Sequence, residues 1–568
     1  MQVIGEGGLL KLIIKEYLTT LKEDKELDLL LSDLLLNMRI MPLIKPEKGV
    51  RQYGVDLMGF GKDEDDNKEK LFLFVVKKGD LDRQNWDSGP QAIRPTLNEI
   101  KDTYIPKLLE NKYKNTIIKV ITVFNGDIKQ SVYPNFIGYI DSNQVLNKIE
   151  YDYWNGDKLT LLVEQYILNE NLFPPEYQKS LRKTLALIGD TDYNLNDYYM
   201  LIDQILNSRG KSLKHQIQKL RIINLCLNIV LHWCEEANNI KPAVFASERT
   251  ILRIWEWKKN IQDHPKKINV EIANILSTLN KIWTIYFVKV APSFSIKDGL
   301  FGYGSGADRV EYPLLTFEQI GIISLIGINH FYNGMFSNKN DFTNEINIIG
   351  NSLINLITNN NICFQPLYDG HIIDISLALL LLKMYKKDTF AKWWIKNIAD
   401  RIVMNYRLRK FFPLFSDSYD ELIENEFMPK EPDISSSTLL YILLEWAVIY
   451  NDDKLYDYLV KIFRSEFSEI DLQLWYPDEK IEEVMYKNNA SLHSGTMFTT
   501  KFYDISFEEI RKQMEVHFNK FGIYDKLTFM KEGIVIIGLI ASRHFRAPIF
   551  PFYWRGLLFV QKQSEKGE

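Results

Sequence analysis

Two stretches of the sequence, GVDLMGF (Gly54–Phe60) and LFLFVVKKGDL (Leu71–Leu81), decide the fold of the N-terminal part of the chain. Both are rich in apolar and β-branched residues. The segment between them, KDEDDNKEK (62–70), is charged and has no apolar residue. This pattern predicts two antiparallel strands joined by a solvated hairpin loop.

The predicted hairpin carries a carboxylate, Asp56, in its first strand and a lysine, Lys77, in its second. Phosphodiester hydrolysis with Mg²⁺ needs a carboxylate to hold the cation, and a lysine there stabilises charge on the phosphate. Alternation along the second strand puts Val75 on the same face as Lys77, although valine cannot bind a metal. Each residue also has a simpler interpretation: Asp56 caps a turn, and Lys77 protects an edge strand from aggregation.

Other residues near this hairpin are candidates for the same site. Asp80, Asp82 and either Glu6 or Glu16 are candidates for the second metal ligand, and Asp80 is preferred. Four further residues are predicted to contact nucleic acid, three by charge and the tryptophan by stacking on a base: Lys78, Arg83, Arg94 and Trp86. The alternative is a set of surface arginines around a core tryptophan.

The elements around the hairpin alternate between helix and strand. Apolar spacing predicts helices over 9–21 and 27–38, and a third helix that starts at Pro90 or Pro95 and ends near residue 111. Three more strands are predicted over 41–44, 116–127 and 135–141 (NFIGYID).

This arrangement resembles the PD-(D/E)XK nuclease superfamily, the restriction-endonuclease-like fold, over roughly residues 1–158. Asp56 in GVDLMG matches the acidic residue of the superfamily, and Lys77 in FVVKKG matches the lysine of its (D/E/Q)-x-K element. Gln91 near the start of the third helix and the segment YWNGDKLTLLVEQ (153–165) are also similar to superfamily members. The resemblance implies a Mg²⁺ or Mn²⁺ cofactor. Val75 departs from it, because the superfamily has Glu, Asp or Gln there, and a Val75→Glu change is expected to restore a conventional ligand set.

The rest of the chain, residues 159–568, has apolar residues at helical spacing in nearly every segment and no fixed repeat period. We therefore expect an α+β protein with a small restriction-endonuclease-like domain over 1–158 and a large all-α domain over 159–568. The net charge of −5 excludes a global basic footprint for nucleic acid, so any such binding must use a local patch.

Cysteine usage and apolar runs indicate the cellular setting. The three cysteines, Cys226, Cys234 and Cys363, are widely spaced, which favours buried thiols over disulfides or a zinc site. The N-terminus lacks a signal-peptide pattern, and the apolar run 534–541 is too short to span a bilayer. These features predict a cytoplasmic protein without a membrane partner.

The fusion of such a domain to a helical region resembles bacterial antiphage and restriction effectors. The resemblance implies a metal-dependent nuclease regulated by its helical domain, with DNA expected ahead of RNA as the substrate. The alternative is a non-catalytic nuclease fold that binds nucleic acid or a protein as a scaffold. No P-loop motif occurs in the chain, so an NTPase or another defence protein would have to be a separate partner. Self-association into a homo-oligomer stays open.

Overall fold

A computed structural model describes most of the chain, and the statements below concern these residues. The described residues are 6–22, 26–44, 53–88, 92–166, 173, 175–189, 193–210, 212–261, 266–301, 308–335, 342–428, 435–478, 480–486, 495–501, 506–521, 526–547 and 555.

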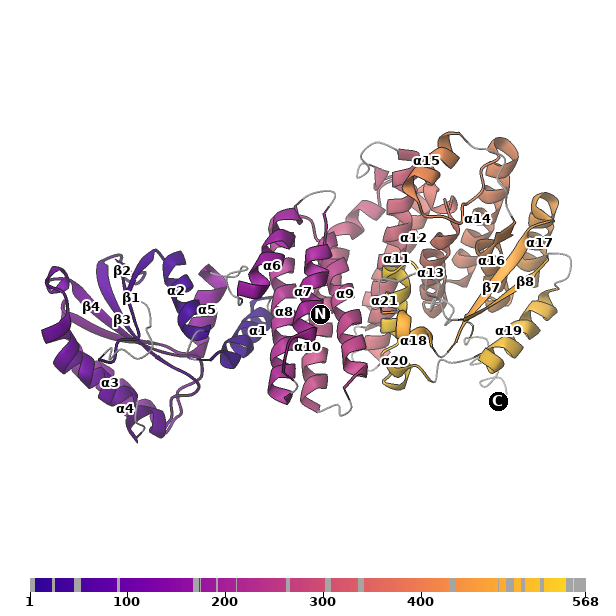
Figure 1. Cartoon of the computed structure of the whole chain (residues 1–568). Coiled ribbons are helices and arrows are strands. Elements are labelled where there is room, and N and C mark those ends of the chain that lie inside the picture. Colours follow the sequence, from indigo (N-terminus) through magenta and orange to yellow (C-terminus); the bar gives the residue numbers. More distant parts are fainter. Residues whose placement is uncertain are drawn as a thin grey trace. The chain divides into compact units, whose positions relative to one another are not determined.

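A five-stranded sheet forms the centre of the N-terminal part (Figure 1). Its strands lie in chain order and are β1 (Ile40–Ile44), β2 (Leu57–Lys62), β3 (Glu69–Lys77), β4 (Ile117–Phe124) and β5 (Ile149–Trp154). The pairs β1–β2 and β2–β3 are antiparallel, whereas the pairs β3–β4 and β4–β5 are parallel. Parallel strands need a crossover connection, and helices supply it here.

Helices cover both faces of this sheet (Figure 1). The helices α1 (Glu6–Thr20), α2 (Asp28–Asn37) and α5 (Gly156–Tyr166) lie on one face. The other face is covered by α3 (Ile93–Glu99), its π-helical extension η3 (Ile100–Leu108) and α4 (Tyr133–Asn143). Because both faces are buried, the strands are nearly continuous in apolar residues.

The strands of the hairpin and β4 lie where the sequence predicts them, but the end of the sheet differs. Residues 135–141, predicted as a strand, belong to helix α4, and the last strand is β5. Pro134 lies in the first turn of α4, where proline is favoured. Phe136 and Ile140, one helical turn apart, are the residues that α4 buries, and helical spacing therefore prevails over the short apolar run.

The hairpin loop also differs from the expectation of a fully solvated tip. Residues 64–69 are exposed, whereas Asp63 and Lys70 at its two ends are 5% and 2% exposed. Their side chains form an ion pair of 2.7 Å. Lys70 stays out of water because carboxylates surround its charge, as a buried lysine requires.

The remainder of the chain is mainly helical, as predicted. The larger helices are α6 (Pro175–Leu187), α7 (Asn196–Asn207), α8 (Leu213–Glu236), α9 (Lys241–Lys259), α10 (Lys266–Phe294), α11 (Asp308–Met335), α12 (Phe342–Asn359), α13 (Ile372–Met384), α14 (Asp388–Arg409), α15 (Tyr419–Phe427), α16 (Thr438–Ile449), α17 (Asp453–Phe467), α19 (Phe507–Phe521) and α21 (Ile536–His544). Internal contacts divide the chain into two compact units, one comprising 1–246 and 264–278 and the other 247–263 and 279–568. The first unit therefore holds the α/β domain together with α6, α7 and α8.

The second unit contains a small sheet that the prediction of an all-α domain did not include. Its strands are β6 (Ser436–Ser437), β7 (Asp471–Pro477) and β8 (Gly495–Thr500). Among the described helices, one stretch, 309–334 in α11, is long and apolar enough to cross a bilayer. Within this stretch 67% of the most apolar window is buried in the protein, as expected of a core helix.

The second unit also buries several ion pairs. Three arginines near the C-terminus pair with carboxylates of other helices: Arg543 with Glu248, Arg546 with Asp374 and Arg555 with Glu445. Removing one partner of a buried pair leaves an uncompensated charge, so these contacts hold residues 536–547 and Arg555 against the helices that carry the carboxylates. The three cysteines are buried thiols, in agreement with the prediction.

Candidate functional site

Asp56 lies just before β2, beside the end of β3. Its backbone N–H donates to the carbonyl of Phe74 at 2.9 Å, which continues the pairing of the two strands. Its carboxylate Oδ2 accepts the backbone N–H of Val76 at 2.7 Å. Gly54, two residues earlier, has a φ of +88°, and a Cβ there would lie 2.9 Å from the carbonyl of Thr96. A glycine is therefore needed for the turn that brings Asp56 to β3.

Lys77 and Lys78 lie at the carboxyl end of β3 and are half-buried. Lys77 is one residue beyond the amide that Asp56 binds, so the aspartate and the lysine lie at the same end of the hairpin. The chain then turns at Gly79, whose N–H donates to Asn125 Oδ1 at 2.7 Å. Asn125 is fully buried, and its Nδ2 donates to the carbonyl of Leu18 in α1 at 2.7 Å. A buried amide thus fixes the segment after the two lysines.

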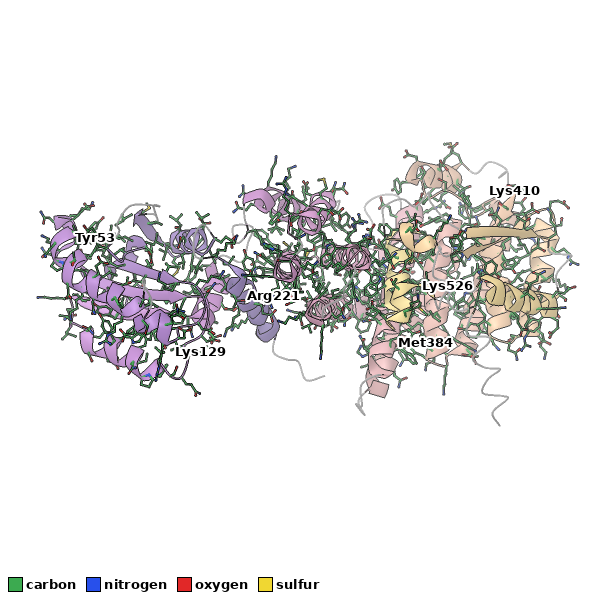
Figure 2. All side chains as sticks on the ribbon, turned by 60° about the horizontal axis from the view of Figure 1, so that its bottom comes forward. Tyr53, Lys129, Arg221, Met384, Lys410 and Lys526 are labelled. Atoms are coloured by element: carbon green, nitrogen blue, oxygen red, sulfur yellow. The ribbon has the colours of Figure 1, made fainter. Side chains whose placement is uncertain are left out.

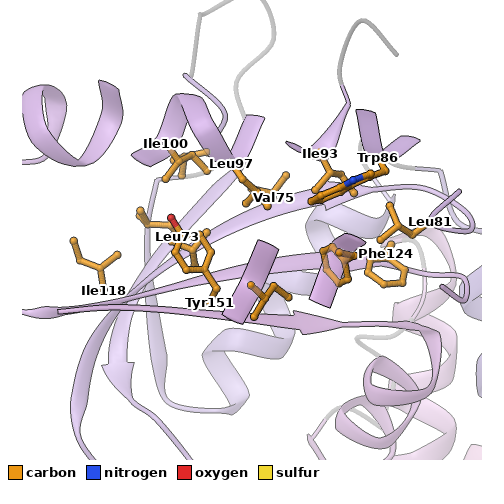
Figure 3. Packing of buried hydrophobic residues seen from close by; sticks show 14 of the residues in the cluster. Leu73, Val75, Leu81, Trp86, Ile93, Leu97, Ile100, Ile118, Phe124 and Tyr151 are labelled. Carbon is orange, nitrogen blue, oxygen red and sulfur yellow. The ribbon is translucent and has the colours of Figure 1, made fainter. Parts of the chain in front are cut away.

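Val75 is the residue that departs from the resemblance described above, which implies an acidic residue there. Its side chain is fully buried and belongs to the apolar cluster under α3. Figure 3 shows it among Leu97, Ile93 and Trp86. A glutamate at residue 75 would have to leave water without a charged partner in this cluster. The expectation that Val75→Glu restores a ligand set therefore does not fit the packing of this strand.

Asp80, the preferred second metal ligand, has both carboxylate oxygens engaged. Oδ1 accepts the backbone N–H of Asp127 at 2.9 Å, and Oδ2 lies 2.6 Å from Nζ of Lys129, which is labelled in Figure 2. The hydrogen bond from Asp127 and the one from Lys129 lower the pKa of Asp80. Gly126 permits this approach, since a Cβ there would lie 2.5 Å from Asp80 Oδ1. Asp80 joins the ends of β3 and β4.

Trp86 is a core residue, 3% exposed. Its ring meets Phe136 and Tyr139 edge to face at centroid distances of 5.4 and 5.6 Å. In this position the ring has no exposed face for a base. Arg83 is exposed, and Arg94 is paired with Asp87 at 3.2 Å. The alternative interpretation, surface arginines around a core tryptophan, describes this region.

The remaining candidate ligands do not gather at Asp56. Asp82 Oδ1 accepts the N–H of Asn85 at 2.8 Å in the loop that follows β3. Glu16 lies beside Arg221 of α8 at 3.9 Å. Gln91 and the side chain of Glu6 lie outside the described residues.

The described residues around Asp56 offer few oxygen ligands for a divalent cation. Mg²⁺ in proteins uses one or two carboxylates and takes its other ligands from water and substrate phosphates. Here Asp56 gives one oxygen to a backbone amide, Val75 gives none, and Asp80 is engaged elsewhere. Within the described ranges, no three His, Cys, Asp or Glu side chains are arranged to hold a metal ion.

A buried charge cluster of Asp63, Lys70 and Lys119 lies at the opposite end of the hairpin. The sequence did not predict it. Lys70 contacts Asp63 and Glu150, each at 2.7 Å, and Lys119 contacts Asp63 at 2.9 Å and Asp65 at 2.8 Å. Burial would raise the pKa of Asp63, but hydrogen bonds from the two lysines outweigh it and lower that pKa. The available signal was register, because Lys70 shares a strand face with the buried Phe72.

Comparison with known proteins adds no relative: no family model, no curated protein and no solved structure matches the chain.

Proposed function

We propose that the N-terminal α/β domain is a nuclease-like fold that binds nucleic acid at the Lys77–Lys78 end of β3, without a two-carboxylate metal centre of its own. The large helical region then serves as the part that docks a partner, as in a defence complex. The order of helices and strands in the domain is compatible with the resemblance seen in the sequence.

The observation that carries this proposal is the contrast between Val75 and Lys77 on one strand. Val75 is fully buried in the apolar cluster, whereas Lys77, two residues later, reaches the half-buried strand end. On this proposal, the strand position that the resemblance assigns to a second metal ligand belongs to the core, while the position suited to a phosphate lies near the surface. A lysine ammonium binds phosphate as a point charge and needs no metal to do so.

A second candidate function is phosphodiester cleavage. It is favoured by the placement of Asp56 and Lys77 at the same end of the hairpin, the pair that the superfamily uses. The two functions predict different behaviour of Asp56. In a binding domain its carboxylate only supports the strand end, whereas in a nuclease its removal abolishes cleavage.

The test is the affinity of the full chain for short labelled duplex DNA, single-stranded DNA and single-stranded RNA, followed by fluorescence anisotropy. We expect Lys77→Met to weaken binding about tenfold, the effect of losing one hydrogen bond to a charged group. It should also reduce the slope of log affinity against log salt by about one. Lys62→Met is the matched control, because Lys62 is an exposed lysine at the far end of β2.

The same samples are then incubated with Mg²⁺ or Mn²⁺ and examined on gels. The proposal expects binding without cleavage. If none of the three nucleic acids binds, the proposal is wrong. Cleavage by the wild type that disappears in Asp56→Asn would replace it with the nuclease function.

A further inference from the structure

A cleft of about 550 Å³ opens within the first unit, between the last turn of α1 and the first turns of α8 and α10. Thr19 and Thr20 contribute from α1, Leu213 and Lys214 from α8, and Lys267 from α10. Binding sites for small organic ligands fall in this range of volume. Neither the sheet nor the proposed nucleic-acid site contributes a residue to this cleft.

The charges of the cleft are divided between floor and rim. On the floor, Arg221, labelled in Figure 2, pairs with Glu271 at 2.8 Å and donates to the carbonyl of Glu16 at 3.2 Å. This arginine compensates the two carboxylates of the floor. On the rim, Lys214 and Lys267 are exposed, and in the part of the chain that the structure describes neither has an ion-pairing carboxylate. The rim is therefore a local excess of positive charge on a chain whose net charge is −5.

An apolar wall lies beside these two lysines. It consists of Leu213, Ile217 and Val270, and the first and last of these are 36% and 52% exposed. Covering such side chains with a flat apolar group removes that area from water, at roughly 25 cal/mol per Å². The cleft thus offers two different contacts side by side, one for an anion and one for a ring.

Hydroxyl groups at the end of α1 complete the lining. Thr19 and Thr20 donate their hydroxyl protons to the carbonyls of Glu16 and Tyr17. Each hydroxyl oxygen therefore keeps lone pairs that can accept a hydrogen bond from a ligand. A sugar hydroxyl or a base amino group is a donor of this kind.

We propose that this cleft is a binding site for a nucleoside phosphate, with the phosphates between Lys214 and Lys267 and the base against Leu213, Ile217 and Val270. The ligand contacts α1 of the α/β domain and the helices α8 and α10 at the same time. Its binding then stabilises the first unit against unfolding, since a ligand that binds only the folded state shifts the equilibrium toward it.

The test is isothermal titration calorimetry of the full chain with ATP, tripolyphosphate and adenosine. We expect the double variant Lys214→Glu/Lys267→Glu to bind ATP about a hundredfold more weakly, roughly tenfold for each lost lysine contact. Lys266→Glu is the matched control, because Lys266 is the exposed neighbour of Lys267 and does not line the cleft. Val270→Asn, which adds no charge, should weaken ATP binding while leaving tripolyphosphate binding within about twofold, because it removes apolar surface from the wall only.

Three results would overturn the proposal. The first is no heat of binding for ATP with the wild-type chain. The second is a loss of ATP affinity in Lys266→Glu as large as that in Lys267→Glu alone, because the two changes alter the net charge equally and the effect would then reduce to net charge. The third is tripolyphosphate binding as tightly as ATP, because the apolar wall would then contribute nothing. Circular dichroism of each variant checks that the exposed substitutions leave the fold intact.

Discussion

The two ends of the β2–β3 hairpin carry the same pair of residue types and use them differently. At one end Asp63 and Lys70 are buried, 2.7 Å apart, and share further charged partners. At the other end Asp56 and Lys77 are half-buried, and the Asp56 carboxylate binds a backbone amide. An aspartate and a lysine at a strand end are thus not a site by themselves. Burial separates the structural end from the candidate functional end.

The largest effect is expected at Val75, which lies between the two ends. Val75→Glu places a carboxylate in the apolar cluster with no described charge beside it, and we expect a loss of unfolding free energy of about 4 kcal/mol or more. Val75→Ala, which only removes volume, should cost about 1–2 kcal/mol. Urea denaturation measures both. Unchanged stability of Val75→Glu together with metal-dependent cleavage would show that residue 75 belongs to a ligand set.

The next effect is expected at the structural end. Asp63→Asn leaves the buried Lys70 and Lys119 with one fewer carboxylate. We expect the unfolding free energy to decrease by about 3 kcal/mol. This value is the low end for a broken buried ion pair, because other carboxylates remain near the two lysines. Asp65→Asn is the control, since Asp65 contacts the same Lys119 at 2.8 Å but has a side chain 67% exposed. It should cost less than about 1 kcal/mol. Equal losses in the two variants would contradict the role of burial.

Acid unfolding sharpens the same comparison. The folded-state pKa of Asp63 is lower than its ordinary value of 3.8, so its stabilising contribution is complete above that value and is lost as the pH falls through the folded pKa. In this window the unfolded chain binds more protons than the folded one, and stability falls with decreasing pH. We expect the stability of Asp63→Asn to fall less than that of the wild type as the pH decreases below 3.8. Thermal unfolding of both proteins over this pH range measures the difference. An unchanged slope would mean that Asp63 does not titrate with folding.

A smaller effect on stability than at Val75 or Asp63 is expected at Asp56. Asp56→Ala removes the acceptor of the Val76 N–H at a half-buried position, and we expect a loss of about 1 kcal/mol. Asp56→Asn keeps an oxygen acceptor and should lie within about 0.5 kcal/mol of the wild type. A loss as large as that of Asp63→Asn would make Asp56 a second structural residue.

The sequence predicted the hairpin, β4 and the helical remainder, because apolar periodicity and charged turns are local signals. It misplaced the last strand, because NFIGYID (135–141) is a short apolar run, which is compatible with either a strand or a helix. In the structure Phe136 and Ile140 pack from one face of a helix. It also missed the Asp63–Lys70–Lys119 cluster, because Lys119 is far away in sequence and reaches Asp63 only when β3 and β4 pair. In the candidate site, the sequence predicted Asp56 inside the first strand of the hairpin, whereas it lies just before β2, at the end where β3 carries Lys77. The burial of Val75 and Trp86 depends on α3 and α4, which the hairpin sequence does not contain.

The most direct measurement compares Lys70→Met with Lys77→Met, for unfolding free energy and for affinity to labelled duplex DNA and single-stranded RNA. The two lysines lie near the two ends of the same strand. We predict that Lys70→Met lowers stability by about 3 kcal/mol and leaves the affinity of the folded chain unchanged, whereas Lys77→Met leaves stability within about 0.5 kcal/mol and lowers affinity about tenfold. Full affinity of Lys77→Met for every nucleic acid that the wild type binds would contradict the functional assignment of this strand end.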